Sequence, residues 1–146
     1  MKLSTKARYG LRATAELALR GAAGEGGAQP VPLSAIAKRQ GISEQYLRQI
    51  FMPLKRSGIV KAVRGKRGGY LLGRRPEGIT ALEVVEAMGE RLAPVFCVGA
   101  PSKCRRVAEC PTHPLWRRLA DAMRGVLSTT TVAQLARDCP RRGLGI

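Results

Sequence analysis

Three of the four cysteines and the only histidine lie within one short segment of the chain. Cys97, Cys104, Cys110 and His113 follow the spacing Cys-x6-Cys-x5-Cys-x2-His. Prolines and a glycine interrupt the segment, and its apolar residues have no regular period, so the sequence predicts a loop there. Thiolates and imidazole are soft donors for metals. Four such donors in one loop predict that a metal ion or a metal cluster orders it.

Burial without a ligand is the simplest alternative for these residues, because cysteines are often small buried apolar residues. The loop is polar, however, and carries Lys103, Arg105, Arg106 and Glu109. Basic neighbours also favour the thiolate form of cysteine, which is the form that binds metals. A bound metal is therefore favoured over simple burial.

Two kinds of metal site remain open from these residues alone. Zinc accepts three cysteines and one histidine, but closed zinc sites usually bring ligands in pairs two to four residues apart. Only Cys110 and His113 have that spacing. An iron–sulfur cluster binds mainly cysteine thiolates, has a larger core that tolerates wider spacing, and accepts a histidine that changes its redox potential. The donors favour a thiolate-rich site without separating zinc from iron–sulfur.

Charge is distributed unevenly along the 146-residue chain, whose formal net charge is +16. Residues 1–76 hold 16 Lys/Arg against 3 Asp/Glu, and residues 77–146 hold 10 against 7. We therefore expect a polyanion-binding domain over residues 1–76 and a sensing or pairing domain over residues 77–146. No segment reads as a membrane span or a signal peptide, which predicts a cytoplasmic protein without a membrane partner.

Two short helices joined by a glycine-containing turn are predicted between residues 34 and 54, after a first helix capped by Ser4. The second of them begins after Ser43 and is typical of a recognition helix. Its inward-facing residues are Leu47, Ile50 and Leu54. Its outward-facing residues, which can donate to base edges, are Gln45, Arg48 and Gln49. Pro53 predicts a kink or an end of this helix near Met52, because proline lacks an amide donor.

A β-hairpin is predicted directly after these helices. Residues 59–64 and 70–72 have the composition of strands, and the glycine-rich segment between them predicts a turn. Arg64, Lys66 and Arg67 lie at the tip, where they can contact phosphates or enter a minor groove. Isolated basic residues are usually only solvated, but a basic hairpin tip beside a recognition helix favours a DNA-binding wing.

The second half of the chain predicts three more helices, at residues 81–88, 113–127 and 132–139. Thr80, Thr112 and Thr131 are their expected N-caps, with capping boxes at the first and the last. The long helix has an apolar stripe broad enough for both a core and a symmetric partner: Leu115, Trp116, Leu119, Met123, Val126 and Leu127. The predicted fold is mainly α with a small β-hairpin wing, a winged helix-turn-helix domain plus a long dimerisation helix.

Several of these motifs, taken together, resemble a known family. They are residues 1–9, 40–43, 46–47 and 64–72, and the cysteine and histidine pattern followed by residues 115–117. Over nearly its whole length the chain is similar to the IscR-type iron–sulfur cluster regulators, which belong to a bacterial family of dimeric winged-helix transcription regulators.

The resemblance implies specific partners and site residues. It implies a homodimer paired through the long helix and bound to double-stranded operator DNA, and a 2Fe–2S cluster held by Cys97, Cys104, Cys110 and His113. It also implies DNA contacts from Ser43, Gln45, Arg48 and Gln49 in the major groove and from Arg64 in the minor groove. Related nitric-oxide sensors use a 4Fe–4S cluster with an acidic ligand from the first helix, where this chain has Arg8. Members without the cluster, such as the cysteine-metabolism regulator, do not need this ligand set.

Three features depart from the resembling proteins. Arg48 stands where they have a glutamate that helps to select between classes of DNA site, and arginine can instead bind guanine bidentately. The first cysteine gap is one residue longer, and Cys139 is an additional thiol with a surface-type setting.

Two other functions stay open, a zinc-stabilised regulator without a cluster and an iron–sulfur carrier or electron-transfer protein. A carrier has no use for a wing. The only histidine is assigned as a ligand, so we do not expect an enzyme.

Overall fold

The computed structural model describes residues 2–21 and 27–140 of the chain. The described residues form α-helices and one antiparallel hairpin, as predicted, together with two short 3-10 helices that the sequence did not predict. The helices of the first part are α1 (Thr5–Gly21), α2 (Leu33–Gln40) and α3 (Glu44–Arg56). The hairpin of β1 (Val60–Val63) and β2 (Gly69–Leu72) is followed by η1 (Pro76–Gly78) and α4 (Ala81–Ala87). The remaining elements are α5 (Phe96–Gly99), η2 (Pro101–Lys103), α6 (His113–Thr129) and α7 (Val132–Asp138).

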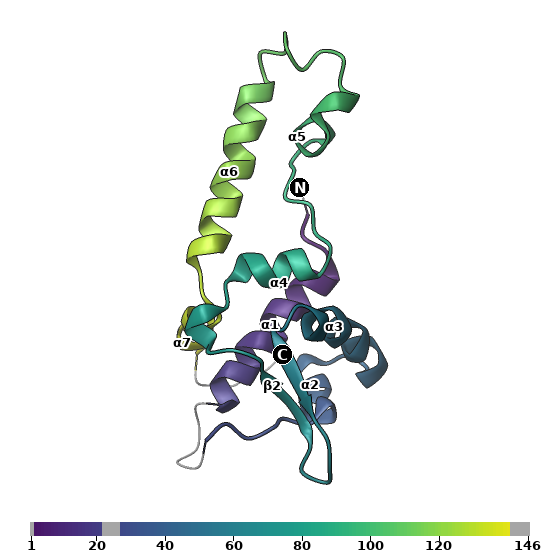
Figure 1. The fold of residues 1–146 in the computed structure, drawn as a ribbon, viewed down its shortest axis with the longest axis vertical. Coiled ribbons are helices and arrows are strands. Elements are labelled where there is room, and N and C mark those ends of the chain that lie inside the picture. The colour runs from purple at the N-terminus through teal and green to yellow at the C-terminus, as the bar shows by residue number, and fades with distance from the viewer. Residues whose placement is uncertain (1, 22–26, 141–146) are drawn as a thin grey trace.

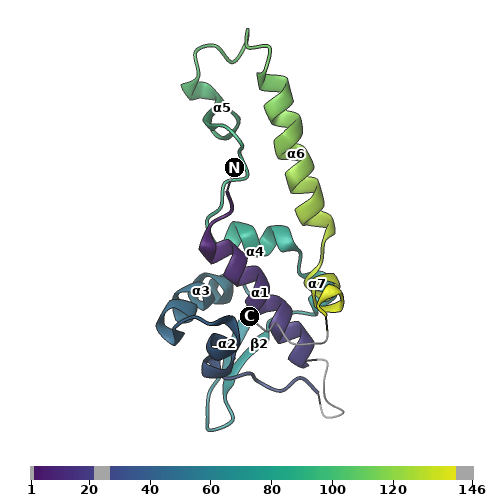
Figure 2. The same ribbon diagram turned by 180° about the vertical axis from the view of Figure 1, so that it is seen from behind.

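Two regions are distinct in space. Figure 1 shows α6 and the segment around α5 extending together away from the other elements, and Figure 2 shows the same arrangement from behind. We call residues 92–129 the arm and the other described residues the base. The ends of the hairpin and of the arm lie at opposite ends of the molecule. Within the described residues, no helix is long and apolar enough to cross a membrane.

The base is built around α1, whose small residues let neighbouring helices approach closely. Ala7, Ala13 and Leu17 are buried on it, and the core continues through α2, α3, β1, α4 and α7. The Ser4 hydroxyl accepts a hydrogen bond from the amide of Ala7 at 3.1 Å, so the predicted cap is formed. Residues on both sides of position 76 share this core. The division into two domains at that position stays a prediction.

The helix-turn-helix follows the predicted pattern. Gly41 ends α2 in the left-handed conformation, with a φ of 65°. The Ser43 hydroxyl then caps α3 by accepting the amide of Tyr46 at 3.1 Å. Leu47, Ile50 and Leu54 are fully buried, as their spacing predicts. The turn and the orientation of α3 are therefore encoded locally by a glycine, a cap and an apolar stripe.

Pro53 does not end the recognition helix: of the kink or end predicted near Met52, the end is wrong, and the kink stays a prediction. Helix α3 continues through the proline to Arg56. Phe51 and Leu54, on either side of it, are buried in the core and hold this turn in place. The carbonyl that loses its amide partner belongs to Gln49, an exposed residue, where water can take the place of the missing donor.

The hairpin is fixed to the base by contacts distant in sequence. Val60 pairs with Leu72 and Val63 with Gly69 in the antiparallel register. Val31 adds a bridge to Tyr70 through two backbone hydrogen bonds of 2.9 Å. A Cβ at position 69 would lie 2.3 Å from the carbonyl oxygen of Val31, so only glycine allows this approach. The Tyr70 ring also packs edge-on against Phe51, with ring centroids 4.6 Å apart.

The arm joins the base through α4 and α7. The predicted capping box of α4 is present, with Thr80 and Glu83 bonded reciprocally. Thr131 caps α7 by accepting the amide of Gln134, but the second bond of the predicted box is not formed. The amide of Ala81 donates to the carbonyl of Thr130 at 2.8 Å, which ties the start of α4 to the residue directly after the arm.

Candidate DNA-binding surface and ligand loop

The recognition helix presents the predicted donors to solvent. Gln45, Arg48 and Gln49 are all exposed on α3, on the side opposite its buried stripe. Ser43 is exposed as well, and its oxygen is used by the cap while its hydroxyl proton remains available to a phosphate. The same helix therefore offers amide, guanidinium and hydroxyl donors along one face.

The hairpin tip carries three exposed basic residues, Arg64, Lys66 and Arg67. The turn is tight because the amide of Gly68 donates to the carbonyl of Gly65 at 3.0 Å. Gly65 has a φ of 116°, which side chains rarely adopt. None of the three basic residues is part of an ion pair within the described residues. Their charges are therefore free to meet phosphates.

A buried carboxylate beneath the helix-turn-helix was not predicted from the sequence. Glu16 of α1 is only 1% exposed and accepts the side-chain amide of Gln40 at 2.8 Å. It also pairs with Arg39 at 3.0 Å and with Arg20 at 3.3 Å. Gln40 and Arg39 end α2 directly before the turn, so this network fixes where the turn leaves α2. The only signal for this network in the sequence is Glu16 itself, a single charged residue on the apolar face of its helix.

Two tyrosines connect α1 to the start of α3. The rings of Tyr9 and Tyr46 meet edge to face with centroids 6.2 Å apart. The guanidinium of Arg12 lies 5.3 Å from the centre of the Tyr9 ring. This stack positions the N-terminal end of the recognition helix from a second side.

The ligand loop contains short helical turns where the sequence predicts only a loop. Cys97 lies on α5, Cys104 directly follows η2, and Cys110 and His113 lead into α6. All three cysteines are partly exposed free thiols. His113 is the first residue of α6 and is only 9% exposed. The predicted donors therefore come from three successive turns of one continuous segment.

The surroundings of Cys110 favour its thiolate form. Its Sγ lies 3.3 Å from the hydroxyl of Thr112. That hydroxyl, followed by the amides of Thr112 and His113 and the charge of Arg106, lowers the pKa of Cys110. Thr112 does not cap α6 with its side chain, so this predicted cap is wrong. The Thr112 hydroxyl, which was expected to cap the helix, forms a hydrogen bond with the Cys110 sulfur instead.

His113 has a buried ring nitrogen without a partner. Within the described residues, Nδ1 of His113 is buried and forms no hydrogen bond. A backbone hydrogen bond of 3.3 Å joins the His113 amide to the carbonyl of Cys110, so these two predicted ligands share one turn. No three His, Cys, Asp or Glu side chains of residues 2–21 and 27–140 gather closely enough to hold a metal ion. The structure therefore brings together one pair of the four predicted ligands.

The chemistry of these donors fits a metal cluster. Three thiols and one imidazole form a soft set, and a buried unpaired nitrogen is costly unless something binds it. The hydrogen bonds around Cys110 stabilise the anionic sulfur that a metal needs. The donors thus have the right types, and Cys110 has the protonation preference that a metal ligand needs.

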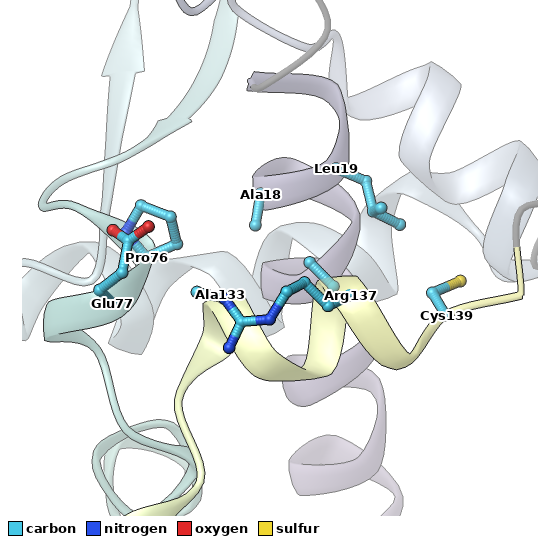
Figure 3. A pocket seen from close by; sticks show the side chains of 8 residues that line it. Ala18, Leu19, Pro76, Glu77, Ala133, Arg137 and Cys139 are labelled. Atoms are coloured by element: carbon cyan, nitrogen blue, oxygen red, sulfur yellow. The ribbon is translucent and has the colours of Figure 1, made fainter.

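Cys139 lies apart from the ligand loop, in the base. It is partly exposed and lies at one end of a cavity of about 350 Å³ between α1, η1 and α7. Figure 3 shows Ala18, Ala133 and Arg137 in the middle of its lining, between Glu77 on one side and Cys139 on the other. Cys139 is thus on a different face from the predicted ligands and does not extend their set.

Comparison with known proteins places the chain among bacterial regulators. Residues 3–138 match the Rrf2 family, described as iron-dependent transcriptional regulators. The HTH-type transcriptional regulator IscR of Escherichia coli is 41% identical over 138 residues, which is 94% of this chain and 82% of that protein.

Solved structures give the same result for the fold. CymR, the global cysteine regulator of B. subtilis, superposes with a TM-score of 0.80 and 36% identity over 96% of this chain and 99% of that chain. IscR of T. potens superposes with a TM-score of 0.72 and 31% identity over 97% and 90% of the two chains. These similarities confirm the predicted winged helix-turn-helix fold.

Proposed function

The chain belongs to the Rrf2 family of iron-dependent transcriptional regulators, and on that premise we propose that an iron–sulfur cluster controls its binding to operator DNA. Its named relatives are transcription regulators, so the protein is a regulator and not an enzyme, as the sequence predicts. The finer proposal concerns the cofactor, the contacts with DNA and the pairing of two copies.

The proposed ligands are Cys97, Cys104, Cys110 and His113, and the proposed group is a 2Fe–2S cluster. One observation carries the proposal: His113 is both a donor with an unpartnered buried nitrogen and the first residue of α6. When bound, such a cluster supplies a redox-active crosslink among cysteine and histidine ligands. The loop residues then hold the start of α6 in one position, because the segment has no core of its own to do so.

A path of direct contacts leads from the ligand loop to the DNA-binding surface. Arg124 of α6 pairs with Glu86 of α4 at 2.7 Å. Helix α7 follows α6 and packs along α1, which in turn supports the turn before α3 through Glu16. A change in the position of α6 can therefore alter the placement of the recognition helix.

We assign the DNA contacts to the residues predicted from the sequence. Ser43, Gln45, Arg48 and Gln49 are proposed to contact the major groove, and Arg64, Lys66 and Arg67 to contact phosphates or the minor groove. Their exposure on adjacent elements of the base supports this assignment. An arginine at position 48 favours guanine as its partner base.

We propose that two copies pair through α6. Leu115 and Val126 are 52% and 65% exposed on this helix. A wholly apolar groove of about 390 Å³ lies around Val126, lined by Leu3, Leu92, Ala122, Met123, Val126 and Leu127. A second copy of the same helix would remove this surface from water and fix the distance between two recognition helices.

The deciding experiment is anaerobic purification followed by iron and sulfide assays, a visible spectrum, and operator binding with and without the cluster. We expect about two iron and two sulfide per protomer, because a 2Fe–2S cluster contains two of each. We also expect a change in operator affinity of at least about fivefold on cluster removal. Cys104→Ala should abolish the cluster, whereas Cys139→Ala, the matched control, should retain it.

Two results would replace the proposal by an alternative. Stoichiometric zinc without sulfide identifies a zinc-stabilised regulator. Equal operator affinity with and without a bound cluster removes the cluster from DNA control, and the absence of any operator binding favours a carrier.

A further inference from the structure

The cavity between α1, η1 and α7 combines an apolar lining with two opposite charges. Its volume of about 350 Å³ is at the lower end of the roughly 300–1,000 Å³ that small-molecule sites occupy. Helices α1 and α7 contribute the short side chains of Ala18, Ala133 and Ala136, all of which are buried. Glu77 and Arg137 line the same cavity from exposed positions. A ligand in the cavity therefore meets apolar surface and both signs of charge.

The fold explains why the space between η1 and α7 is open. The two segments meet where the amide of Val132 donates to the carbonyl of Ile79 at 2.8 Å, beside a bridge between Thr80 and Thr131. From this junction α7 runs along α1, whereas the chain before Ile79 leads back through η1 to the hairpin. The alanines that face the gap end at Cβ and are too short to fill it.

The protein does not neutralise the two charged residues of the cavity with one another. Within residues 2–21 and 27–140, Arg137 forms no ion pair. Glu77 meets only Arg75, with 3.7 Å between Nε and Oε2, and both of these side chains are exposed. Figure 3 shows the guanidinium of Arg137 beside Ala133, on the side of the cavity that faces Glu77. One guanidinium and one carboxylate are thus available to a ligand.

We propose that this cavity binds a free α-amino acid with a small apolar side chain. The guanidinium of Arg137 binds the carboxylate of the amino acid, and the carboxylate of Glu77 accepts its ammonium group. The apolar side chain contacts Ala18, Ala133 and Ala136. A simple carboxylic acid would bring an anion close to Glu77, and a simple amine would bring a cation close to Arg137. A zwitterion satisfies both residues.

The proposed site is separate from the ligand loop and requires no metal cluster. It lies in the base, between η1, which follows the wing strand β2, and α7, which follows the arm. A bound amino acid contacts both η1 and α7, so it joins the end of the wing to the helix that continues from the arm.

Isothermal titration calorimetry of the full chain with L-alanine, L-valine and L-methionine tests the proposal. Isovalerate and isobutylamine are the matched probes, because they are valine without its ammonium group and valine without its carboxylate. Hydrogen exchange of the same mixtures locates the bound ligand. The variants Glu77→Gln and Arg137→Gln each remove one charge from the cavity. Glu109→Gln and Arg118→Gln remove the same charges from exposed positions of the arm and are the controls.

We expect L-valine to bind with a Kd of about 1 mM or lower, and isovalerate and isobutylamine to bind at least about tenfold more weakly. Glu77→Gln and Arg137→Gln should each weaken the binding of L-valine by at least about fivefold. The two control variants should bind it as the wild type does. L-Valine should slow the hydrogen exchange of residues 77–79 and 132–138 and leave that of residues 113–129 unchanged.

Four results overturn the proposal. They are no binding of any of the three amino acids, equal affinity for L-valine and either matched probe, unchanged affinity for L-valine in both cavity variants, and protection by L-valine that is confined to α6. The matched probes need no substitution, so they test the recognition of both charges even if a variant folds poorly. The titration needs neither a cluster nor DNA, so failure of the proposed function does not affect it.

Discussion

The base and the arm differ in what holds them together. The base buries large apolar side chains from every one of its principal helices, including Phe51, Ile36 and Leu47. Of the arm residues, all of which are described, only His113 and Ala120 are buried. Phe96, Leu115 and Val126 of the arm are instead exposed. The base thus has a core of its own, while the arm presents apolar surface and soft donors.

This difference separates two ways of ordering a chain. Burial of apolar area stabilises the base without a ligand or a partner. The arm has too little buried surface to offset the loss of conformational entropy, so its order depends on what it binds. Under the proposed function, the base is a DNA-reading unit that keeps its shape, and the arm is a sensing unit whose shape depends on its ligand.

The largest expected effect compares one phenylalanine from each region. Phe51→Ala should lower the free energy of unfolding by about 3–5 kcal/mol, since its ring is 1% exposed and packs on Tyr70. Phe96→Ala should change it by less than about 0.5 kcal/mol, because its side chain is 66% exposed. Urea denaturation of both apoprotein variants, followed by far-UV circular dichroism, measures the two values. Equal losses would mean that the arm has a core of its own.

Removal of the proposed cluster sharpens the same comparison. Hydrogen exchange of the amides in residues 97–112 should accelerate by about 100-fold in the apoprotein, equivalent to ~2.7 kcal/mol of lost local stability. Amides around Ile50 in the core should exchange at the same rate in both forms. Mass spectrometry of peptides from the two regions provides the measurement. A base that loosens as much as the arm would contradict the division between them.

Variants of the proposed DNA-contact residues test whether the base alone recognises the operator sequence. Arg48→Ala should relax base preference at one operator position, and Arg64→Ala should weaken binding across sequences, each by about 1–3 kcal/mol. Neither change should alter iron content. Arg75→Ala is the matched control, because its side chain is 89% exposed and lies outside the proposed contacts. Fluorescence anisotropy with a set of single-base operator variants measures these effects. Unchanged binding in both variants would exclude the assigned contacts.

The two regions were also predictable from the sequence to different degrees. In the base, caps at Ser4, Ser43 and Thr80 and the apolar stripe of α3 follow from residues close in sequence, and all are present. Contacts between distant segments were missed, such as the bridge from Val31 to Tyr70 and the network around Glu16. Local patterns carry no information on which distant segment supplies a partner.

The arm shows the limits of local patterns more strongly. The donor types and the long helix were evident from the sequence. Thr112, however, has the sequence pattern of an N-cap, but its hydroxyl forms a hydrogen bond with the Cys110 sulfur and not with the helix amides. Its hydroxyl had two possible partners, the helix amides and the Cys110 thiol, and spacing alone does not rank them. Which of the four proposed ligands lie together likewise depends on the closure of a whole loop.

The smallest expected effect concerns the boundary, where α4 joins the two regions. The amide of Thr80 and then the side chain of Arg74 lower the pKa of Glu83 below its ordinary value. A carboxyl with a depressed folded-state pKa adds stability that is fully present above its unfolded pKa and is lost as pH falls through the folded value. At pH 7, Glu83→Gln should therefore cost no more than about 0.5 kcal/mol, because the pair with Arg74 is exposed to solvent.

Between pH 7 and pH 3 the difference in unfolding free energy between the wild type and Glu83→Gln should shrink, since the wild-type carboxyl becomes protonated. Glu86→Gln is the matched control, because it removes the same charge from α4 but breaks the pair with Arg124 of the arm. Its effect should appear in the hydrogen exchange of α6 and not in the pH dependence of the base. If Glu83→Gln instead loosens α6, the capping box of α4 serves the arm, and the boundary between the two regions lies before Thr80 and not after Ala87.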